Sequence, residues 1–409
     1  MKFRVCLTLI AASVHVRAVC SSSSPSSLTS TFLYGWYANP TVDGRWGHWN
    51  HSLLPHWTEA VRARYPDGVS WRPPADLHSA FFPRGGPYSS SDDSKLRAQL
   101  AEMSKSGVGA AIVSWWGRAG TSGGDSQGVR TESFLARVFA EAEAAGAAGG
   151  ACVRVVPHLE PYAGRDVAAL RADIEQLSSL YGDSPAWLRI NGRRVYYVYD
   201  SYHIEAAEWS RLLTHKGDMT LRDDPALDGF FIGLWLDRHH GAELASGGFD
   251  GAYTYFASAG QSYGSTPDHW PAMVSEAKTL GLRVVPCVGP GYDDSRIRPW
   301  NVGATRSREG GAYYKRMWQA ALASGAHHVG VTSWNEWGEG TQVEPAEPRV
   351  VDVAALAPLG EALDADLRAR LGAKDAYADY SPHDPDYYLT LTREFSLLLE
   401  GRVEGDADL

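Results

Sequence analysis

Cysteine and basic side chains are scarce in this chain. Its 409 residues include four cysteines, and 38 Lys and Arg stand against 48 Asp and Glu, for a formal net charge of −10 at pH 7. Cys6 and Cys20 lie near the N-terminus, while Cys152 and Cys287 lie on expected buried strands, where free thiols are favoured over a disulfide. The acidic balance argues against a nucleic-acid partner, because such proteins carry a basic face.

Long apolar runs are absent beyond the N-terminus, and no internal repeat is evident. Lys2 and Arg4 precede the apolar run Val5 to Val14, and small residues follow near Cys20, a pattern typical of a secretory signal. The run is short for a membrane span, although an uncleaved membrane anchor stays open as an alternative. The expected division is a signal peptide or signal anchor at 1–20, a Ser-rich linker at 21–31, one domain at 32–398 and an acidic tail at 399–409.

Short β-rich runs alternate with helical patterns along the rest of the chain, which predicts parallel βα units. The expected strands are Phe32–Tyr37, Ala110–Trp115, Val153–Pro157, Val195–Tyr199, Gly229–Leu234, Gly251–Tyr255, Arg283–Cys287 and Val329–Ser333. Helical patterns cover Ser94–Lys105, Thr131–Ala145, Val167–Tyr181, His269–Leu280 and Gly311–Ser324. This order predicts an α/β fold, a single (β/α)8 TIM-type barrel whose extended βα loops form a cleft at the C-terminal ends of the strands.

Two carboxylates follow the last expected strand. Glu336 and Glu339 lie among Trp and Gly residues in the segment Ser333–Glu344. If this loop makes one helical turn, both side chains share a face, with Cβ atoms about 5–6 Å apart. Glycosidic bond cleavage uses such a pair, and retaining enzymes separate the two carboxyl groups by about 5–5.5 Å. The alternative is a capped surface turn with solvated carboxylates.

Polar and aromatic residues also mark the ends of the other expected strands. These candidates for sugar binding are Tyr37, Asp43, Arg45, Trp116, His158, Glu160, Tyr162, Tyr199, Asp200, Tyr253, Tyr255 and Asn335. A polar network in the core is the alternative for the group around His158, and a salt bridge or cap is favoured for Glu344. The pairs His239-His240 and His327-His328 lack the ligand spacing of a zinc site, so no metal is expected.

Eight strings, in order along the chain, carry a family resemblance. Besides the segment 333–344 they are FLYGWYANPTVDGRWGHW at 32–49, SWW at 114–116, HLEPYAGR at 158–165, YYVYDSY at 196–202, GFDGAYTYFAS at 248–258, VGPGYDDSRIRPWN at 288–301 and YSPHDPDYYLTLTREF at 380–395. Together they resemble glycoside hydrolase family 99, the endo-α-1,2-mannosidases. The resemblance covers about Phe32 to Phe395 and agrees with the predicted barrel.

The resemblance implies a retaining, endo-acting hydrolase of glucosylated high-mannose N-glycans that needs no cofactor. By motif position, Glu336 is the base that deprotonates the substrate's own 2-hydroxyl to form a 1,2-anhydro sugar, and Glu339 is the acid and then the base. Trp116 stands where members of the family stack on the sugar before the cleavage site, and Arg45 stands where they often show Lys. Gly338 replaces a His that is common in animal members.

The implied setting is the Golgi lumen, with the chain membrane-anchored or soluble, and a secreted protein is the alternative. We expect a monomer whose partner is the glycan. Two other functions stay open: a related hydrolase acting on another surface polysaccharide, and a non-catalytic glycan-binding protein. The GTQ after Glu339 favours the mannosidase, and the presence of both carboxylates argues against the binding protein. The sequon Asn50-His51-Ser52 lies in the aromatic loop expected near the cleft.

Overall fold

The computed structural model describes residues 28–65, 70–119, 124–125, 127–150, 153–351 and 376–405. The expected leader, with Cys6 and Cys20, lies outside these residues, as does Cys152. Cys287 is a buried free thiol. Within the described ranges, every helix is too short or too polar to cross a membrane.

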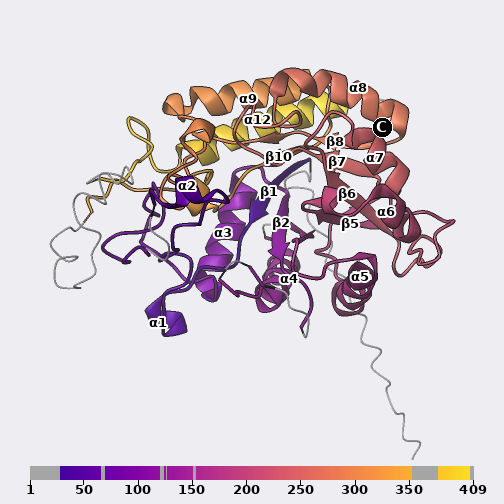
Figure 1. The fold of residues 1–409 in the computed structure, drawn as a ribbon, viewed down its shortest axis with the longest axis horizontal. Helices are drawn as coiled ribbons and strands as arrows, with labels where there is room; N and C mark the ends of the chain where they lie inside the picture. The colour runs from indigo at the N-terminus through magenta and orange to yellow at the C-terminus, as the bar shows by residue number, and fades with distance from the viewer. Residues whose placement is uncertain are drawn as a thin grey trace, which may run out of the picture.

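Nine parallel strands of the described chain form one sheet that curves into a barrel (Figure 1). They are β1 (Thr29–Leu33), β2 (Ala110–Trp115), β3 (Arg154–Leu159), β5 (Arg193–Val198), β6 (Gly229–Leu234), β7 (Gly251–Tyr253), β8 (Arg283–Val285), β9 (Cys287–Val288) and β10 (Val329–Val331). A short β4 (Arg189–Ile190) pairs antiparallel with β5. The strand order β8-β7-β6-β5-β3-β2-β1-β10-β9 runs around the barrel.

One interrupted strand closes the ring. β8 pairs with β7, while β9, which follows directly after Pro286, pairs with β10. Proline has no backbone N–H to donate to a ladder, so the strand is split at this residue, yet its carbonyl still accepts from Gly330 N at 3.0 Å. Counting β8 and β9 as one strand, the predicted (β/α)8 barrel is confirmed.

Helices surround the strands (Figure 1). The longer ones are α3 (Asp93–Lys105), α4 (Glu132–Ala147), α5 (Val167–Tyr181), α6 (Ala206–Leu213), α7 (His240–Gly247), α8 (Trp270–Leu280), α9 (Ala312–Ala323) and α12 (Tyr387–Gly405). Two short helices, α1 (Pro40–Asp43) and α2 (Glu59–Arg62), lie on the long loop after β1. Sequence periodicity predicted α5, β2 and β6 with the bounds observed, but it missed α6, α7 and α12.

The side chains of each strand divide between two hydrophobic clusters. Phe32 and Ile112 belong to the cluster inside the barrel, whereas their neighbours Leu33 and Val113 belong to the cluster between sheet and helices. Successive side chains of a strand point to opposite faces, and here both faces are buried. Burial of both faces explains why the strands appear in the sequence as continuous apolar runs. The alternation directs every second side chain into the barrel, and near the strand ends these side chains lie at its mouth.

The first strand lies earlier in the chain than expected. β1 covers Thr29–Leu33 rather than Phe32–Tyr37, so it begins inside the Ser-rich segment. Its ladder partners fix these limits: Thr29 to Thr31 pair with β10, and Ser30 to Leu33 pair with β2. The residues expected at its C-terminal end therefore belong to the loop beyond the barrel.

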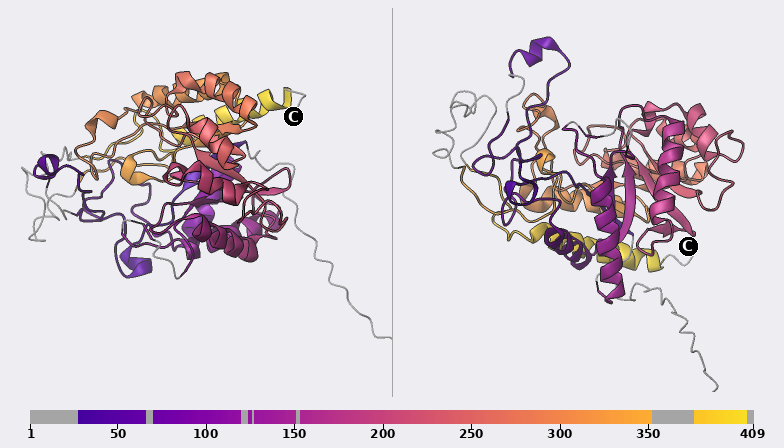
Figure 2. Two further views of the ribbon diagram at one scale, coloured as in Figure 1. Left: turned by 45° about the vertical axis from the view of Figure 1, so that its right-hand side comes forward. Right: turned by 90° about the horizontal axis from the view of Figure 1, so that it is seen from below.

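The C-terminal helix ties the last part of the chain to the barrel wall. α12 packs against α3 and α9, and the view from below in Figure 2 shows it (yellow) beside α3. Phe395 stacks on Trp318 of α9 with ring centroids 5.5 Å apart, and Tyr314 and Thr392 share a hydrogen bond of 2.9 Å. The helix continues to Gly405 and so runs through the boundary that the sequence analysis placed after residue 398.

Two adjacent leucines test this correction. Leu399 is 0% exposed while Leu398 is 58% exposed. Leu399→Ala is expected to lower the free energy of unfolding by about 2–5 kcal/mol, because it removes packed methyl groups and leaves a cavity. The matched control Leu398→Ala should change it by about 0.5 kcal/mol or less. Urea unfolding measures both, and equal effects would mean that residues beyond 398 are not part of the folded domain.

Candidate active site

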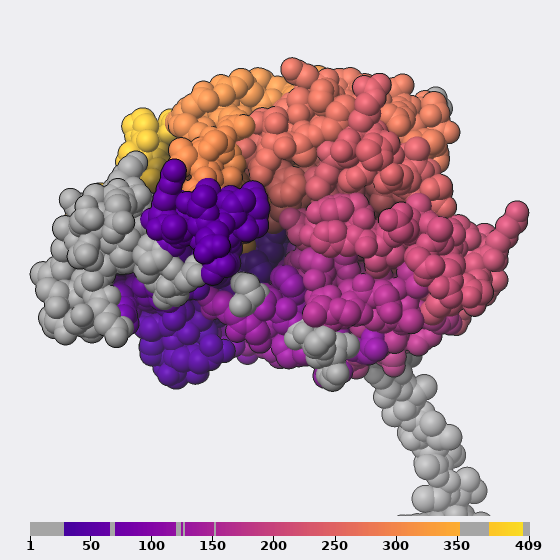
Figure 3. All heavy atoms as spheres, in the orientation of Figure 1, coloured from indigo at the N-terminus to yellow at the C-terminus, as the bar shows by residue number. Residues whose placement is uncertain are grey.

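A cleft with a volume of about 250 Å³ opens at the C-terminal ends of the strands. Figure 3 shows this face hollowed near its middle, beside the indigo lobe that carries α2. Loops from around the whole barrel contribute side chains to it. The lining residues are Tyr34, Trp36, His48, His51, Leu54, His78, Trp116, Asp125, His158, Glu160, Pro161, Tyr199, Tyr255, Ile297, Arg298, Glu336, Gly338 and Glu339.

Glu336 and Glu339 face this cleft from the two ends of one helical turn. The turn is a short 3₁₀ helix, η5 (Trp337–Glu339), with Glu336 as its N-cap. The Glu336 carboxylate accepts from Gly338 N at 3.2 Å, and Gly340, with φ of 62°, ends the turn. Residues three apart are eclipsed in a 3₁₀ helix, so both carboxylates lie on one side, as the sequence predicted.

Burial controls the electrostatics of this pair. It raises the pKa of Glu336 well above its usual range, and the neighbouring charge of Glu339 raises it further. Burial also raises the pKa of Glu339, but Arg298 opposes the shift, because its Nη1 lies 3.1 Å from the Glu339 carboxylate. The ion pair with Arg298 therefore supports the ionised form of Glu339, whereas burial and the charge of Glu339 disfavour the ionised form of Glu336.

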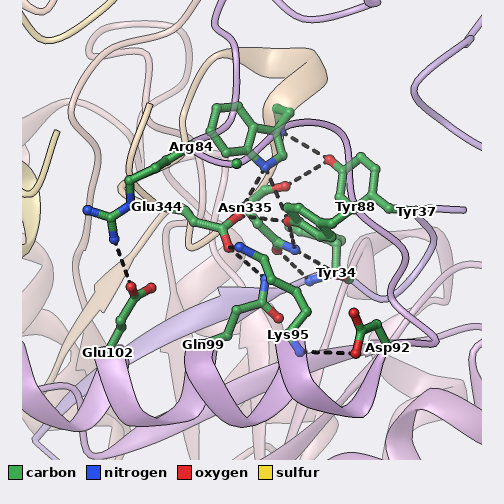
Figure 4. Close-up of polar contacts among 12 residues, drawn as sticks. Tyr34, Tyr37, Arg84, Tyr88, Asp92, Lys95, Gln99, Glu102, Asn335 and Glu344 are labelled. Carbon is green, nitrogen blue, oxygen red and sulfur yellow. Dashed lines mark hydrogen bonds and ion pairs between the residues drawn. The ribbon is translucent and has the colours of Figure 1, made fainter. Parts of the chain in front are cut away.

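A third carboxylate of the same loop, Glu344, is not among the residues that line the cleft, and Figure 4 shows it beside Lys95 and Gln99 of α3. It is 1% exposed and forms an ion pair of 2.9 Å with Lys95 of α3. It also accepts hydrogen bonds from Tyr88 at 2.7 Å, from Gln99 at 2.8 Å and from the Trp337 indole at 3.1 Å. The salt bridge favoured for Glu344 is confirmed, and this cluster anchors the loop that carries η5 to α3.

Asn335 and Tyr37, both expected to bind sugar, are used instead to hold the loop. The Asn335 amide accepts from Tyr34 N and donates to Tyr34 O, both at 2.9 Å. The Tyr37 hydroxyl donates to Asn335 O at 2.8 Å and accepts from Trp337 N at 3.2 Å. Neither side chain lines the cleft, because both point into the protein behind η5.

The candidates around His158 form a layered network at the mouth of the barrel. Nε2 of His158 lies 2.8 Å from the Tyr253 hydroxyl, and Nδ1 of the same ring lies 3.3 Å from the Glu160 carboxylate. Tyr253 lies beneath this layer, whereas Tyr255 reaches the cleft and meets the Tyr34 hydroxyl at 2.5 Å. His158, Glu160 and Tyr255 line the cleft and also belong to a polar network, so the two interpretations of this group are compatible. Tyr199 lines the cleft as well.

Aromatic rings form the walls. Trp116 is half-buried at the end of β2 and lines the cleft. Trp36, which the sequence analysis did not single out, stacks between Tyr34, at 4.5 Å and 20°, and His48, at 4.6 Å and 2°. His48 is held by Asp125 at 2.6 Å. Such flat apolar faces suit the CH faces of a pyranose.

Four other candidates lie outside the lining. Asp43 accepts from Asn39 N at 2.8 Å at the start of α1, and Arg45 is exposed just after this helix. The Tyr162 hydroxyl donates to the buried carboxylate of Asp173 on α5. Asp200 follows β5 in a left-handed conformation, with φ of 46°.

Several lining residues were missed by the sequence analysis. Trp36, His48 and Arg298 stand within the strings at 32–49 and 288–301, but nothing in the strings distinguishes them from their neighbours. His78 and Asp125 lie outside every string, so no local signal marks them. Their place in the cleft depends on contacts with residues distant in sequence.

Gly338 is explained by its surroundings. A Cβ at this position would lie 3.0 Å from Cδ2 of His78 and 3.2 Å from the Glu336 carboxylate. A side chain here would therefore displace His78. Burial lowers the pKa of His78 well below its usual range, so a neutral imidazole occupies the space beside η5.

One group of potential metal ligands lies outside the cleft. His239, His240 and Glu243, at the start of α7, each offer a ligand atom within 4.8 Å of the others. Nδ1 of His240 accepts from the amides of Leu236 and Asp237 at 3.2 and 3.3 Å, so a neutral His240 carries its proton on Nε2. A metal ion would compete with these amides for Nδ1. That this site holds no metal stays a prediction.

Comparison with known proteins gives concordant matches. The sequence model of glycosyl hydrolase family 99 matches residues 26–400. The glycoprotein endo-alpha-1,2-mannosidase of Xenopus laevis is 39% identical over 370 residues, which cover 89% of this chain and 75% of that protein. The enzyme of the same name from Mus musculus is 36% identical, with 89% and 73% covered. The GH99 endo-alpha-mannosidase from Bacteroides thetaiotaomicron superposes with a TM-score of 0.79 at 35% identity, covering 92% of this chain and 99% of that chain.

The buried ion pair in Figure 4 offers a stability test with a control in the same view. Glu344→Gln removes the charge opposite Lys95 and turns one acceptor into a donor that faces other donors. We expect the free energy of unfolding to fall by about 2–3 kcal/mol. Glu102→Gln, which removes a more exposed partner of Arg84, should cost about 1 kcal/mol or less. Equal losses in urea unfolding would contradict the anchoring role of Glu344.

Proposed function

The chain belongs to glycosyl hydrolase family 99, and on this premise we propose that it is a retaining, endo-acting α-1,2-mannosidase of high-mannose N-glycans. The observation that carries the proposal is the pair Glu336 and Glu339, which face an aromatic-walled cleft from one 3₁₀ turn. The names of its relatives, endo-alpha-1,2-mannosidases, support the same bond and the same mode of cleavage.

The proposed reaction has two steps. In the first, Glu336 takes the proton of the substrate's 2-hydroxyl, O2 forms a bond to the anomeric carbon, and the bond to the leaving oxygen breaks as Glu339 protonates it. In the second, water attacks the anomeric carbon of the 1,2-anhydro sugar and Glu339 takes the water proton. The bond between the anomeric carbon and O2 breaks, and Glu336 returns its proton to O2. Each step inverts the anomeric carbon, so the net result is retention. Water is the only co-reactant.

These roles require the shared proton on Glu339 at the start. In the free protein, Arg298 supports the ionised form of Glu339, while burial and the charge of Glu339 raise the pKa of Glu336. A 2-hydroxyl that donates a hydrogen bond to Glu336 stabilises its carboxylate. Substrate binding thereby moves the proton to Glu339, where the leaving oxygen needs it. Binding and activation of the acid are then a single event.

Trp116 bears on the sugar in the outer part of the cleft. Indole offers a broad apolar face and one N–H donor, and it is a poor partner for the equatorial 2-hydroxyl by which glucose differs from mannose. We expect the chain to accept a terminal mannose there at least as readily as glucose. The N-terminal pattern of residues 1–20 supports action in the secretory pathway, with the Golgi lumen as the proposed site and a monomer as the proposed state.

Glycan digestion tests the activity and the role of each carboxylate. The purified protein should release a disaccharide or longer fragment from both glucosylated and non-glucosylated high-mannose N-glycan, as read by mass spectrometry. Glu339→Gln should abolish this cleavage but retain part of the activity on an aryl mannoside, because a good leaving group needs little protonation. Glu336→Gln should lose both activities, since the 2-hydroxyl must be deprotonated in either case.

Three outcomes would count against the proposal. Release of single mannose units would mean exo-action, and binding without any product would mean a lectin-like protein. Cleavage of another polysaccharide, with none of the N-glycan, would show that the protein is a hydrolase of a different substrate. Equal losses for both variants on both substrates would leave the pair essential but contradict the separate roles.

Arg298→Gln should shift the pH profile of kcat/KM upward. The guanidinium lowers the pKa of both carboxyls, so its loss raises both, and the two limbs of the bell-shaped profile move to higher pH by about one unit. Arg298→Lys keeps a cation and should leave the profile near that of the wild type. An unchanged profile for Arg298→Gln would show that Arg298 does not set the charge of the pair.

A further inference from the structure

Three aromatic rings cluster on the surface beside the cleft. Trp57, just before α2, is 80% exposed, although indole is one of the side chains that gain most from burial. The His56 ring stacks on it with centroids 3.8 Å apart, and Trp300 meets Trp57 and His56 edge-on at 5.3 and 4.7 Å. We refer to His56, Trp57 and Trp300 as the aromatic platform.

The platform is built on the wall of the cleft itself. Leu54 and Ile297 line the cleft, and Leu54 N donates to Ile297 O at 2.8 Å. The Trp300 indole donates to Leu54 O at 3.2 Å, which joins the two segments beyond the cleft. The same segment carries Arg298, the partner of Glu339. The platform therefore continues the wall that carries Arg298 and lies beside the proposed acid.

The orientation of the rings is set before any ligand arrives. Nδ1 of His56 accepts from Thr58 N at 3.0 Å, so the neutral ring carries its proton on Nε2 and is fixed in plane against Trp57. The platform thus offers a large, preorganised apolar face with an adjacent N–H donor. A pyranose matches this chemistry, because it combines a face of CH groups with hydroxyl acceptors at its edge.

We propose that the aromatic platform is an additional sugar-binding site, which holds a pyranose of the N-glycan on the leaving-group side of the scissile bond. This inference rests on the proposed function, since Glu339 marks the leaving-group side only if it is the acid. The platform adds affinity for long, branched glycans and contributes nothing to substrates that lack sugars on that side.

Two substrates with the same donor sugars separate these cases. One is the complete high-mannose N-glycan, and the other carries an aryl group in place of the leaving glycan. Trp57→Ala should lower kcat/KM about three- to tenfold on the complete glycan. The loss should appear in KM with kcat unchanged, because the ring contacts the sugar equally in the ground and transition states. The aryl substrate should be cleaved at the wild-type rate, and Trp57→Phe should restore most of the lost activity.

Val302→Ala is the matched control, because Val302 is 68% exposed on the chain just after Trp300. It should leave both substrates unaffected. If Trp57→Ala lowers kcat/KM equally on both substrates, or on neither, the platform is not a sugar-binding site.

A binding measurement keeps this inference separate from the proposed function. The trimmed glycan that remains after cleavage still carries the leaving-group sugars, so calorimetry with it requires no turnover. Weaker binding to Trp57→Ala than to the wild type supports the platform even if the protein hydrolyses nothing. Equal binding overturns the platform even if hydrolysis proceeds as proposed.

Discussion

The amide of Asn335 holds the turn that carries Glu336 and Glu339 against the segment that follows the first strand, and the rest of the site depends on this pairing. The ladder between β1 and β10 ends at Val331, beyond which the chain leaves the sheet. Trp334 N still donates to Phe32 O at 2.9 Å, and the Asn335 side chain then pairs with both main-chain groups of Tyr34, at 2.9 Å each. Buried backbone groups must find partners, and this one amide satisfies two of them. Glu336 follows directly, so its carboxylate is positioned by the barrel.

Buried charge is handled in two different ways on this one loop. Glu344 is surrounded by Lys95 and three hydrogen-bond donors, which compensate its charge fully within the protein. Glu336 is buried and Glu339 is partly buried, but both face a cleft, and of the two only Glu339 pairs with the cation beside them, Arg298, at 3.1 Å. An incompletely compensated pair costs stability, but it gives the raised pKa values that acid–base chemistry near neutral pH needs. Glu344, whose charge is fully paired, stabilises the turn on which the destabilising pair Glu336 and Glu339 lies.

Local patterns predicted part of the site. The spacing of Glu336 and Glu339 and the apolar run before them were enough to place both carboxylates on one side of a turn. Tyr253 and Tyr255 were both candidates for sugar binding, and both belong to the cluster inside the barrel, but only Tyr255 lines the cleft. How far each tyrosine lies below the mouth of the barrel was not predictable, because this depends on where the strand ends relative to its neighbours. Tyr37 and Asn335 show the same limit, since strand-end residues can face either the cleft or the loop behind it.

The sequence by itself determined the number, order and parallel arrangement of the strands, because apolar periodicity and turn residues act over a few neighbouring positions. It also determined the chemistry of the cleft through the pair of carboxylates. Only the tertiary structure decided which groups tune that chemistry: Arg298 beside Glu339, Asp125 beside His48 and Lys95 beside Glu344. These contacts join segments that follow different strands, and closing the barrel, through the strand interrupted at Pro286, brings their side chains within reach. No local pattern encodes such distances, because they arise only when every strand has found its neighbours.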